Sequence, residues 1–449
     1  MKEDKLDLEY IFKRYLPDRF EREKKERISG EIIENIKSKL EKMGVEAEPM
    51  LVGSQSRGTE LKNSDLDIFI VFSTKYSRKE MEDAGMEIGF EIFPEGTAKY
   101  AEHPYVSGIM EGVKVDIVPC FRVEMNRKII SSVDRTPLHT QFMRNAMDDE
   151  MRKEAILLKL FMKRQGIYGS ELKTSGFSGY VCELIILKFK RFNSFIEYVS
   201  NLKGRLIIGD EDRTSKFNSP VVIIDPVDLG RNAAAAVSEG NLSILKTAAK
   251  FYNLNPCNFF FTFDEKIDRI NRVERGTYMC LIRWKRPDII DDILYPQLEL
   301  SERNLKTLCE TSGFHYINGY VNLDGENMEI LIEMESGHLN RIEKREGPPV
   351  ENQNSISFIR KYLDSDRRSR GPYVENGRVY FDLFRDETYF KDIFFKNIQK
   401  INFGHNINRL KGEIIFEDRL EKIRETRIYE MFLNFQRPVL PSGEYLNKN

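Results

Sequence analysis

The spacing of apolar side chains divides the first third of the chain into helices and strands. Between residues 7 and 45, apolar positions recur every three or four residues among charged ones, which predicts amphipathic helices. Short runs rich in β-branched and aromatic residues then predict strands, and the segment 80–90 between two of them reads as a helix. The predicted strands are 46–51, 65–72 and 113–118. This α/β unit should close near residue 148.

The pattern changes twice further along the chain. Helical spacing predicts helices over 149–164, 180–192 and 233–252, with Ser178 placed to cap the second of them. Beyond residue 258, strands at 278–284, 316–323 and 328–334 alternate with helices. We therefore predict an α+β multidomain protein. Its predicted parts are a head (1–148), a helical neck (149–257), an α+β body (258–320 and 390–449) and an inserted tail subdomain (321–389).

Composition narrows the class of protein. With 449 residues, the chain exceeds the roughly 250–300 residues that one hydrophobic core usually serves. Hydrophobic residues make up 41% and charged residues 32%, and no apolar run approaches the roughly 20 residues needed to cross a bilayer. The charged N-terminus lacks the apolar segment of a signal peptide, so we expect a cytoplasmic protein.

The counts of cysteine, histidine and charge limit the possible chemistry. Five scattered cysteines without a CxxC pair favour buried thiols over a zinc or redox site, and five histidines include no HxxxH pair. Any metal site must therefore be built from carboxylates. Because 70 basic residues nearly balance 72 acidic ones, nucleic-acid binding would require local basic patches.

Three aspartates provide such a carboxylate site. Asp65 and Asp67 stand two apart in a predicted strand, so both side chains should point to the same face, opposite the apolar Leu66 and Ile68. Asp116 interrupts an otherwise apolar strand, and a buried charge requires a partner or a metal. Three hard oxygen ligands on neighbouring strands suit Mg²⁺. Two such ions could clamp the attacking and leaving oxygens of an in-line displacement.

A polar turn precedes the aspartate pair. Glycine at Gly53 would let the backbone approach a phosphate, and Ser54 with nearby backbone N–H groups could hold phosphate oxygens at a helix start. Arg57 could add a charged contact. A surface turn is a reasonable alternative for the Gly-Ser pair taken by itself, but the complete arrangement favours nucleotide binding.

Taken together, Gly53-Ser54, Asp65-Leu66-Asp67 and Asp116 resemble the signature of the polymerase β nucleotidyltransferase superfamily. Further segments narrow the resemblance to archaeal class I CCA-adding enzymes, and they extend over nearly the whole chain. These segments are 100–105, 115–120, 134–137, 166–169, 176–180, 225–228 and 370–373. The resemblance implies a polymerase β-like head, a helical neck and an RNA-binding body with its tail.

The resemblance also implies an activity. Such enzymes add C, C and A to tRNA 3′ ends from CTP and ATP without a nucleic-acid template. By position, Asp65 and Asp67 would ligate two Mg²⁺ ions, and Asp116 would ligate metal and help to activate the terminal ribose hydroxyl. Relatives often have glutamate where this chain has Asp65, which leaves the fine geometry open. A homodimer is expected by the same analogy.

The nucleotide contacts implied by the resemblance fall on eight residues. They are Gly53, Ser54, Arg57, Thr136, His139, Lys159, Tyr168 and Arg231. Arg231 matches an arginine that binds the incoming base, a role that suits the directional donors of a guanidinium. Judged only from their surroundings in the sequence, Lys159 reads as a helix lysine whose ammonium reaches out to solvent and His139 as a surface histidine.

Two basic patches are candidate RNA contacts. They comprise Arg283, Lys285 and Arg286, and Arg360, Lys361, Arg367, Arg368 and Arg370. Runs of charge are usually solvated surface, but the resemblance implies that the body and tail hold the acceptor stem and TΨC arm of tRNA. Two alternatives remain at this point. One is a poly(A)-type RNA-tailing polymerase, and the other is an RNA-binding protein with an inactive nucleotidyltransferase domain.

Overall fold

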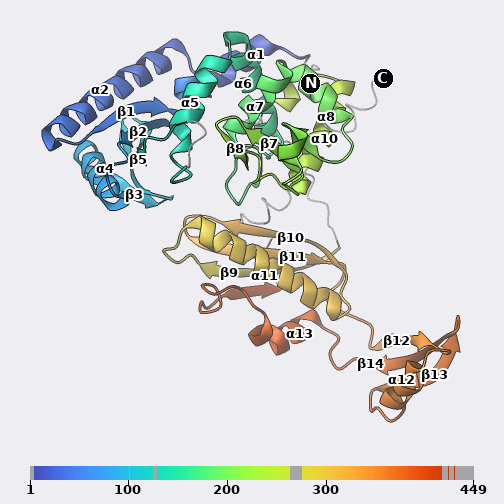
Figure 1. The fold of residues 1–449 in the computed structure, drawn as a ribbon. Coiled ribbons are helices and arrows are strands. Elements are labelled where there is room, and N and C mark those ends of the chain that lie inside the picture. The colour runs from blue at the N-terminus through green and yellow to red at the C-terminus, as the bar shows by residue number, and fades with distance from the viewer. Residues whose placement is uncertain are drawn as a thin grey trace. The chain divides into compact units, whose positions relative to one another are not determined.

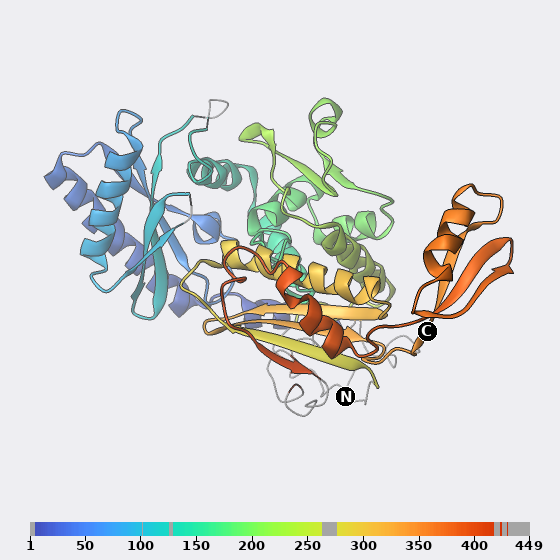
Figure 2. The same ribbon diagram turned by 90° about the horizontal axis from the view of Figure 1, so that it is seen from below.

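The computed structural model describes residues 5–100, 102–124, 129–262 and 276–416, together with Ile423 and Tyr429. The chain forms two compact units, one within Met1–Glu265 and one within Lys266–Arg437. Figures 1 and 2 show the elements of each unit in two views. No helix of the described residues is long and apolar enough to cross a membrane.

The head contains a five-stranded sheet in the order β1-β2-β5-β4-β3. Its strands are β1 (Ala47–Val52), β2 (Leu66–Phe72), β3 (Thr97–Tyr100), β4 (Pro104–Met110) and β5 (Val113–Phe121). The central strands β2 and β5 run parallel, whereas the other neighbours are antiparallel. Between β1 and β2 lies the short helix α3 (Gly53–Arg57).

Each face of β2 packs into a separate apolar cluster. Leu66, Ile68 and Ile70 join the core formed with α2 (Arg19–Met43) and α4 (Arg78–Ile92), which lie beside the sheet in Figure 1. Phe69 and Val71 point to the other face, into a smaller cluster with residues of β1 and β5. The strand is therefore held on both sides, which confirms the predicted apolar face and fixes the residues at the strand's start.

The rest of this unit is largely helical, which agrees with the helices predicted at 149–164, 180–192 and 233–252, whereas α5 was not predicted. Its helices are α1 (Leu8–Tyr15), α5 (Arg135–Ala146), α6 (Asp149–Arg164), α7 (Gly179–Phe189), α8 (Phe192–Ser200), α9 (Glu211–Thr214), α10 (Glu239–Leu254) and the 3₁₀ turn η1 (Asn258–Phe260). The core contains a group of packed aromatic rings, among them Phe161, Phe192 and Phe261. Ser178 caps α7, because its hydroxyl accepts a hydrogen bond from the backbone N–H of Val181.

A small sheet in this region was not predicted. It contains β6 (Leu206–Ile208), β7 (Val221–Asp225) and β8 (Asp228–Asn232). Strands of three to five residues carry too little periodicity to be recognised, and β6 finds its parallel partner β7 across an intervening helix. The turn between β7 and β8 brings two aspartates, Asp225 and Asp228, to one end of the hairpin.

The second unit contains a body sheet and a smaller tail sheet. The body sheet has the order β10-β11-β9-β15, from β9 (Tyr278–Lys285), β10 (Tyr316–Leu323), β11 (Asn327–Met334) and β15 (Glu413–Phe416). The helices α11 (Asp291–Thr311) and α13 (Phe390–Asn397) share one apolar core with the sheet, and the 3₁₀ turn η2 (Ile398–Lys400) follows α13. Figure 2 shows α11 lying along the strands.

The tail sheet has the order β12-β14-β13 and its own apolar core. Its elements are β12 (Ile342–Pro349), α12 (Asn354–Leu363), β13 (Arg368–Glu375) and β14 (Arg378–Phe384). The predicted boundary at residue 321 falls inside β10, and β11 pairs with β9 along its whole length rather than joining the tail. Strand pairing between distant segments sets this boundary, and the sequence pattern does not reveal it. All five cysteines are buried, as predicted.

Candidate active site

The parallel pairing of β2 and β5 places two of the three aspartates side by side. Asp67 stands in register with Asp116, and both belong to the face of the sheet that carries Phe69 and Val118 further along. Asp65 immediately precedes β2 and is more open, with 45% of its side chain exposed against 14% for Asp116. The structure therefore brings Asp67 and Asp116 together on a rigid strand pair, with Asp65 at its edge.

Two neighbours of these aspartates were missed in the sequence. The ammonium group of Lys114 forms ion pairs with Asp65 and, at 3.4 Å, with Oδ2 of Asp116. Ser107 on β4 donates a 2.6 Å hydrogen bond to Oδ1 of Asp116. Lys114 could have been found, because it stands two residues before Asp116 and so shares its face of the strand. Ser107 depends on strand pairing and leaves no local signal.

The electrostatics of this cluster favour a cation. Burial and the charges of Asp116 and Asp65 raise the pKa of Asp67 to about 6. Among the described residues, no group of three or more His, Cys, Asp or Glu side chains is arranged to hold a metal ion. A hard divalent ion that keeps waters and substrate phosphates needs only one or two carboxylates from the protein. Asp67 and Asp116, which stand side by side on paired strands, supply a carboxylate pair that fits such an ion.

The turn into α3 passes directly beside the aspartates. Gly53 has a positive φ of 72°, and a Cβ atom at this position would lie 2.3 Å from Oδ2 of Asp67. Glycine is required here both for the backbone conformation and for the space. Ser54, half-buried, follows in the first turn of α3. The structure thus places the predicted phosphate-binding turn next to the predicted metal ligands.

Arg57 and Lys159 meet in a buried cluster around Glu183, a residue that sequence reasoning missed. Lys159 has 1% of its side chain exposed, and its ammonium donates to the carbonyl and hydroxyl of Thr59 at 3.0 and 2.8 Å and to Oε1 of Glu183 at 2.7 Å. Nε of Arg57 lies 2.7 Å from Oε2 of Glu183, as an ion pair without hydrogen-bond alignment. Lys159 is therefore not a lysine whose ammonium reaches solvent, the alternative considered from the sequence.

Tyr168 lies next to this cluster. A Cβ atom on Gly179, the first residue of α7, would be 2.9 Å from the Tyr168 hydroxyl and 3.4 Å from Cε of Lys159. Burial raises the pKa of Tyr168, so its hydroxyl stays protonated and able to donate. The start of α7 is thus where two predicted nucleotide contacts come close to each other.

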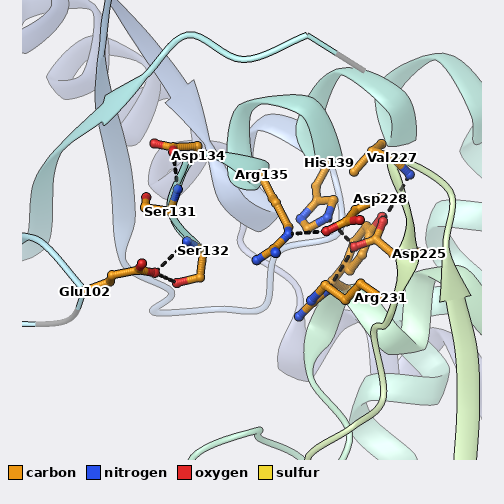
Figure 3. A network of polar contacts seen from close by, with 11 residues as sticks. Glu102, Ser131, Ser132, Asp134, Arg135, His139, Asp225, Val227, Asp228 and Arg231 are labelled. Atoms are coloured by element: carbon orange, nitrogen blue, oxygen red, sulfur yellow. Dashed lines mark hydrogen bonds and ion pairs between the residues drawn. The ribbon is translucent and has the colours of Figure 1, made fainter. Parts of the chain in front are cut away.

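His139 and Arg231 meet at a second buried carboxylate (Figure 3). Nε2 of His139 and Nη1 of Arg231 each lie 2.8 Å from Oδ2 of Asp225, whose side chain is fully buried. Burial disfavours the charged carboxylate, but the hydrogen bond and charge of His139, with further bonds from Val227 and Arg231, lower the pKa of Asp225 to about 2. His139 is thus not the ordinary surface histidine considered from the sequence. Thr136 is half-buried one turn earlier in α5.

The predicted RNA contacts divide into two groups. Arg283, Arg286 and Arg367 form ion pairs within the protein, with acidic partners at 2.7, 2.6 and 2.9 Å respectively. The exposed group comprises Lys285, Arg360, Lys361, Arg368 and Arg370. Within the tail sheet, Arg370 lies over the ring of Tyr373, and Tyr373 stacks on Tyr380 with ring centroids 5.8 Å apart. The tail thus carries four exposed cations and a pair of stacked rings.

Comparison with known proteins identifies the domains of the chain. Three family models match: a nucleotidyltransferase domain over residues 31–139, the second domain of tRNA nucleotidyltransferase over 153–262, and the C-terminal domain of CCA-adding enzyme over 275–416. The first covers the aspartate cluster and Gly53, and the second covers Lys159, Tyr168 and Arg231. Most of the described chain is therefore matched by a nucleotidyltransferase domain model and by two models of tRNA nucleotidyltransferase domains.

Three curated relatives named CCA-adding enzyme align along most of the chain. One from Picrophilus torridus is 46% identical over 409 residues, covering 91% of this chain and 94% of the relative. One from Thermoplasma volcanium is 38% identical, covering 96% and 97%, and one from Methanocaldococcus jannaschii is 34% identical, covering 91% and 96%. This chain belongs to the CCA-adding enzyme family of tRNA nucleotidyltransferases.

Proposed function

We propose that this protein adds C, C and A to the 3′ end of tRNA, using CTP and ATP and releasing pyrophosphate. The observation that carries the proposal is the register of Asp67 with Asp116 beside Gly53, in a chain whose relatives are named CCA-adding enzymes. A pair of fixed carboxylates next to a phosphate-binding turn suits nucleotidyl transfer. The terminal ribose hydroxyl of the tRNA attacks the α-phosphate of the nucleotide.

Asp65, Asp67 and Asp116 are the proposed ligands of two Mg²⁺ ions. When bound, the ions supply charge neutralisation for the attacking and leaving oxygens. The protein contributes rigidity, because Asp67 and Asp116 sit on strands packed on both faces, and Ser107 orients the carboxylate of Asp116. The ammonium group of Lys114 partly neutralises Asp65 and Asp116 through its ion pairs.

The remaining roles follow from position. We assign Ser54 and Arg57 to the triphosphate, and Thr136, His139 and Tyr168 to the sugar and phosphates. Lys159 acts through the buried cluster, because its ammonium group is engaged with Thr59 and Glu183. The exposed cations of the tail and body are the proposed contacts to the acceptor stem and TΨC arm. We further propose that the protein is a homodimer located in the cytoplasm.

The decisive experiment measures incorporation of each of the four nucleotides, with Mg²⁺, into tRNAs that end before CCA, after C and after CC. Addition of C to the first two and A to the third, followed by arrest, is expected. Continued addition of A to all three substrates would identify a tailing polymerase instead. No addition to any tRNA would indicate an inactive RNA-binding protein.

Asp116→Asn tests the catalytic cluster within the same assay. Loss of one carboxylate from the proposed metal site should lower the rate by about 100-fold or more, with little loss of folded protein. Asp83→Asn, which changes an exposed aspartate on α4, is the matched control and should leave the rate unchanged. A well-folded Asp116→Asn enzyme with wild-type rate would disprove the assignment of the metal site.

A further inference from the structure

The buried carboxylate of Asp225 forms hydrogen bonds with four partners. Oδ2 lies 2.8 Å from Nε2 of His139 and 2.8 Å from Nη1 of Arg231. Oδ1 accepts hydrogen bonds from the Tyr180 hydroxyl at 3.0 Å and from the backbone N–H of Val227 at 3.1 Å. Such a carboxylate is costly to bury unless every bond to it is made. Its position at the end of β7 is therefore fixed by elements on three sides.

The bond to Arg231 leaves the rest of that guanidinium accessible. Arg231 has 36% of its side chain exposed, although Nη1 is tied to a fully buried oxygen. A guanidinium is planar and rigid, so fixing one of its nitrogens restricts the direction of its other N–H groups. In Figure 3, Arg231 extends from β8 below Asp225, on the other side of the carboxylate from Val227.

The same carboxylate also fixes His139. The imidazole ring stacks on the ring of Tyr180 with centroids 3.9 Å apart and planes inclined by 26°. His139 from α5, Tyr180 from α7 and Arg231 from β8 therefore share Asp225 as their common partner. A shift of the carboxylate would move two of the proposed nucleotide contacts, His139 and Arg231, together.

We propose that Asp225 is a positioning residue for nucleotide selection, which holds the guanidinium of Arg231 so that its outward N–H groups meet acceptors and reject donors. At the Watson–Crick edge, cytosine N3 and adenine N1 are acceptors, whereas uracil N3 and guanine N1 carry hydrogens. A fixed donor thus favours C and A over U and G, whereas an arginine free to turn does not. This inference rests on the proposed function.

Asp225→Asn keeps the shape of the side chain but removes its charge, and its amide NH₂ group cannot accept bonds from donors. The charge-assisted bond to Arg231 is weakened, so the guanidinium gains freedom. We expect the preference for CTP over UTP, and for ATP over GTP, to fall by about tenfold to hundredfold. The measurement is kcat/KM for each of the four nucleotides, together with their binding constants from calorimetry.

Asp228→Asn is the matched control. Asp228 stands three residues away in the same hairpin and binds a different arginine, Arg135, at 2.8 Å (Figure 3). This variant should keep wild-type selectivity. Tyr180→Phe removes one hydrogen bond to Asp225 but leaves the buried charge paired, so it should fold and lose selectivity by a smaller factor. It decides the question if Asp225→Asn does not fold.

The proposal is overturned if selectivity in folded Asp225→Asn, or in Tyr180→Phe where the former does not fold, equals that of wild type. It is equally overturned if the rates for all four nucleotides fall by the same factor, because that pattern indicates a purely structural role. Failure of the wild-type protein to add C and A would reject the proposed function instead. In that event the ratio of CTP to UTP binding, compared between wild type and variant, still tests Asp225.

Discussion

At the scale of single residues, two independent constraints require glycine at Gly53. Its φ of 72° disfavours any side chain, and the space where a Cβ would stand is taken by the carboxylate of Asp67. Gly44, which ends α2, has a similar φ of 65° but open space around it. Substitution of Gly44 therefore tests backbone strain alone, whereas substitution of Gly53 tests backbone strain together with displacement of Asp67.

Gly53→Ala should lower both stability and activity. Strain at a positive φ costs about 1 kcal/mol, and Asp67 must turn away from its place, which should reduce the rate by about 100-fold. Gly44→Ala should lose a similar amount of stability and keep its rate. Urea unfolding and initial rates of C addition measure the two effects. A Gly53→Ala enzyme with wild-type rate would show that Asp67 does not need this position.

At the scale of elements, one carboxylate joins three helices. Glu183 on α7 pairs with Lys159 on α6 and with Arg57 at the end of α3. Burial disfavours its charge, but the charges of Lys159 and Arg57, with hydrogen bonds from Lys159 and Thr59, lower the pKa of Glu183 to about 2. Because the pKa of an unfolded glutamate is about 4.3, this group stabilises the fold fully above that pH. The stabilisation is lost as pH falls toward 2.

Glu183→Gln tests this link between helices. At neutral pH, the substitution leaves two buried cations without their anion and should cost about 3–5 kcal/mol. Between about pH 5 and pH 2, the variant should lose less further stability than wild type. Glu150→Gln is the control, because Glu150 forms an exposed ion pair with Arg191 and should cost less than about 1 kcal/mol. Parallel pH profiles for wild type and Glu183→Gln would refute the assignment.

At the scale of the whole molecule, charge is nearly balanced. With 70 basic and 72 acidic residues, attraction to RNA must come from where the cations lie. The structure separates candidates such as Arg370, exposed in the tail sheet, from candidates such as Arg283, which is paired with Glu329 and Glu413. Basic residues that look alike in the sequence thus differ in the structure. Some are exposed and can contact phosphate, and others are already neutralised by acidic side chains.

Salt dependence distinguishes these two groups. If Arg370 contacts a tRNA phosphate, Arg370→Ala should reduce the slope of log affinity against log salt concentration by about one. Arg283→Gln should leave the slope unchanged, because its charge is already compensated within the body sheet. Binding of tRNA measured from low to moderate salt gives both slopes. An equal slope for wild type and Arg370→Ala would show that Arg370 does not contact a tRNA phosphate.

The sequence by itself determined the local features. Alternation placed Leu66 and Ile68 in the core and left Asp67 on the opposite face, because a strand repeats every two residues. The same rule would have placed Lys114 beside Asp116. The capping role of Ser178 was also readable, because it depends on residues close together in the chain. The reaction class was indicated by the resemblance of Gly53-Ser54, Asp65-Leu66-Asp67 and Asp116 to a known signature.

Only the tertiary structure decided which distant residues meet. Glu183 contacts Thr59 across 124 positions and Asp225 contacts His139 across 86, so neither pair leaves a periodic signal in the sequence. The small sheet around β7 and the limits of the tail arise from strand pairing of the same long-range kind. The local sequence pattern determines to which face of its strand or helix a side chain points. Which residue it contacts there depends on how the whole unit packs.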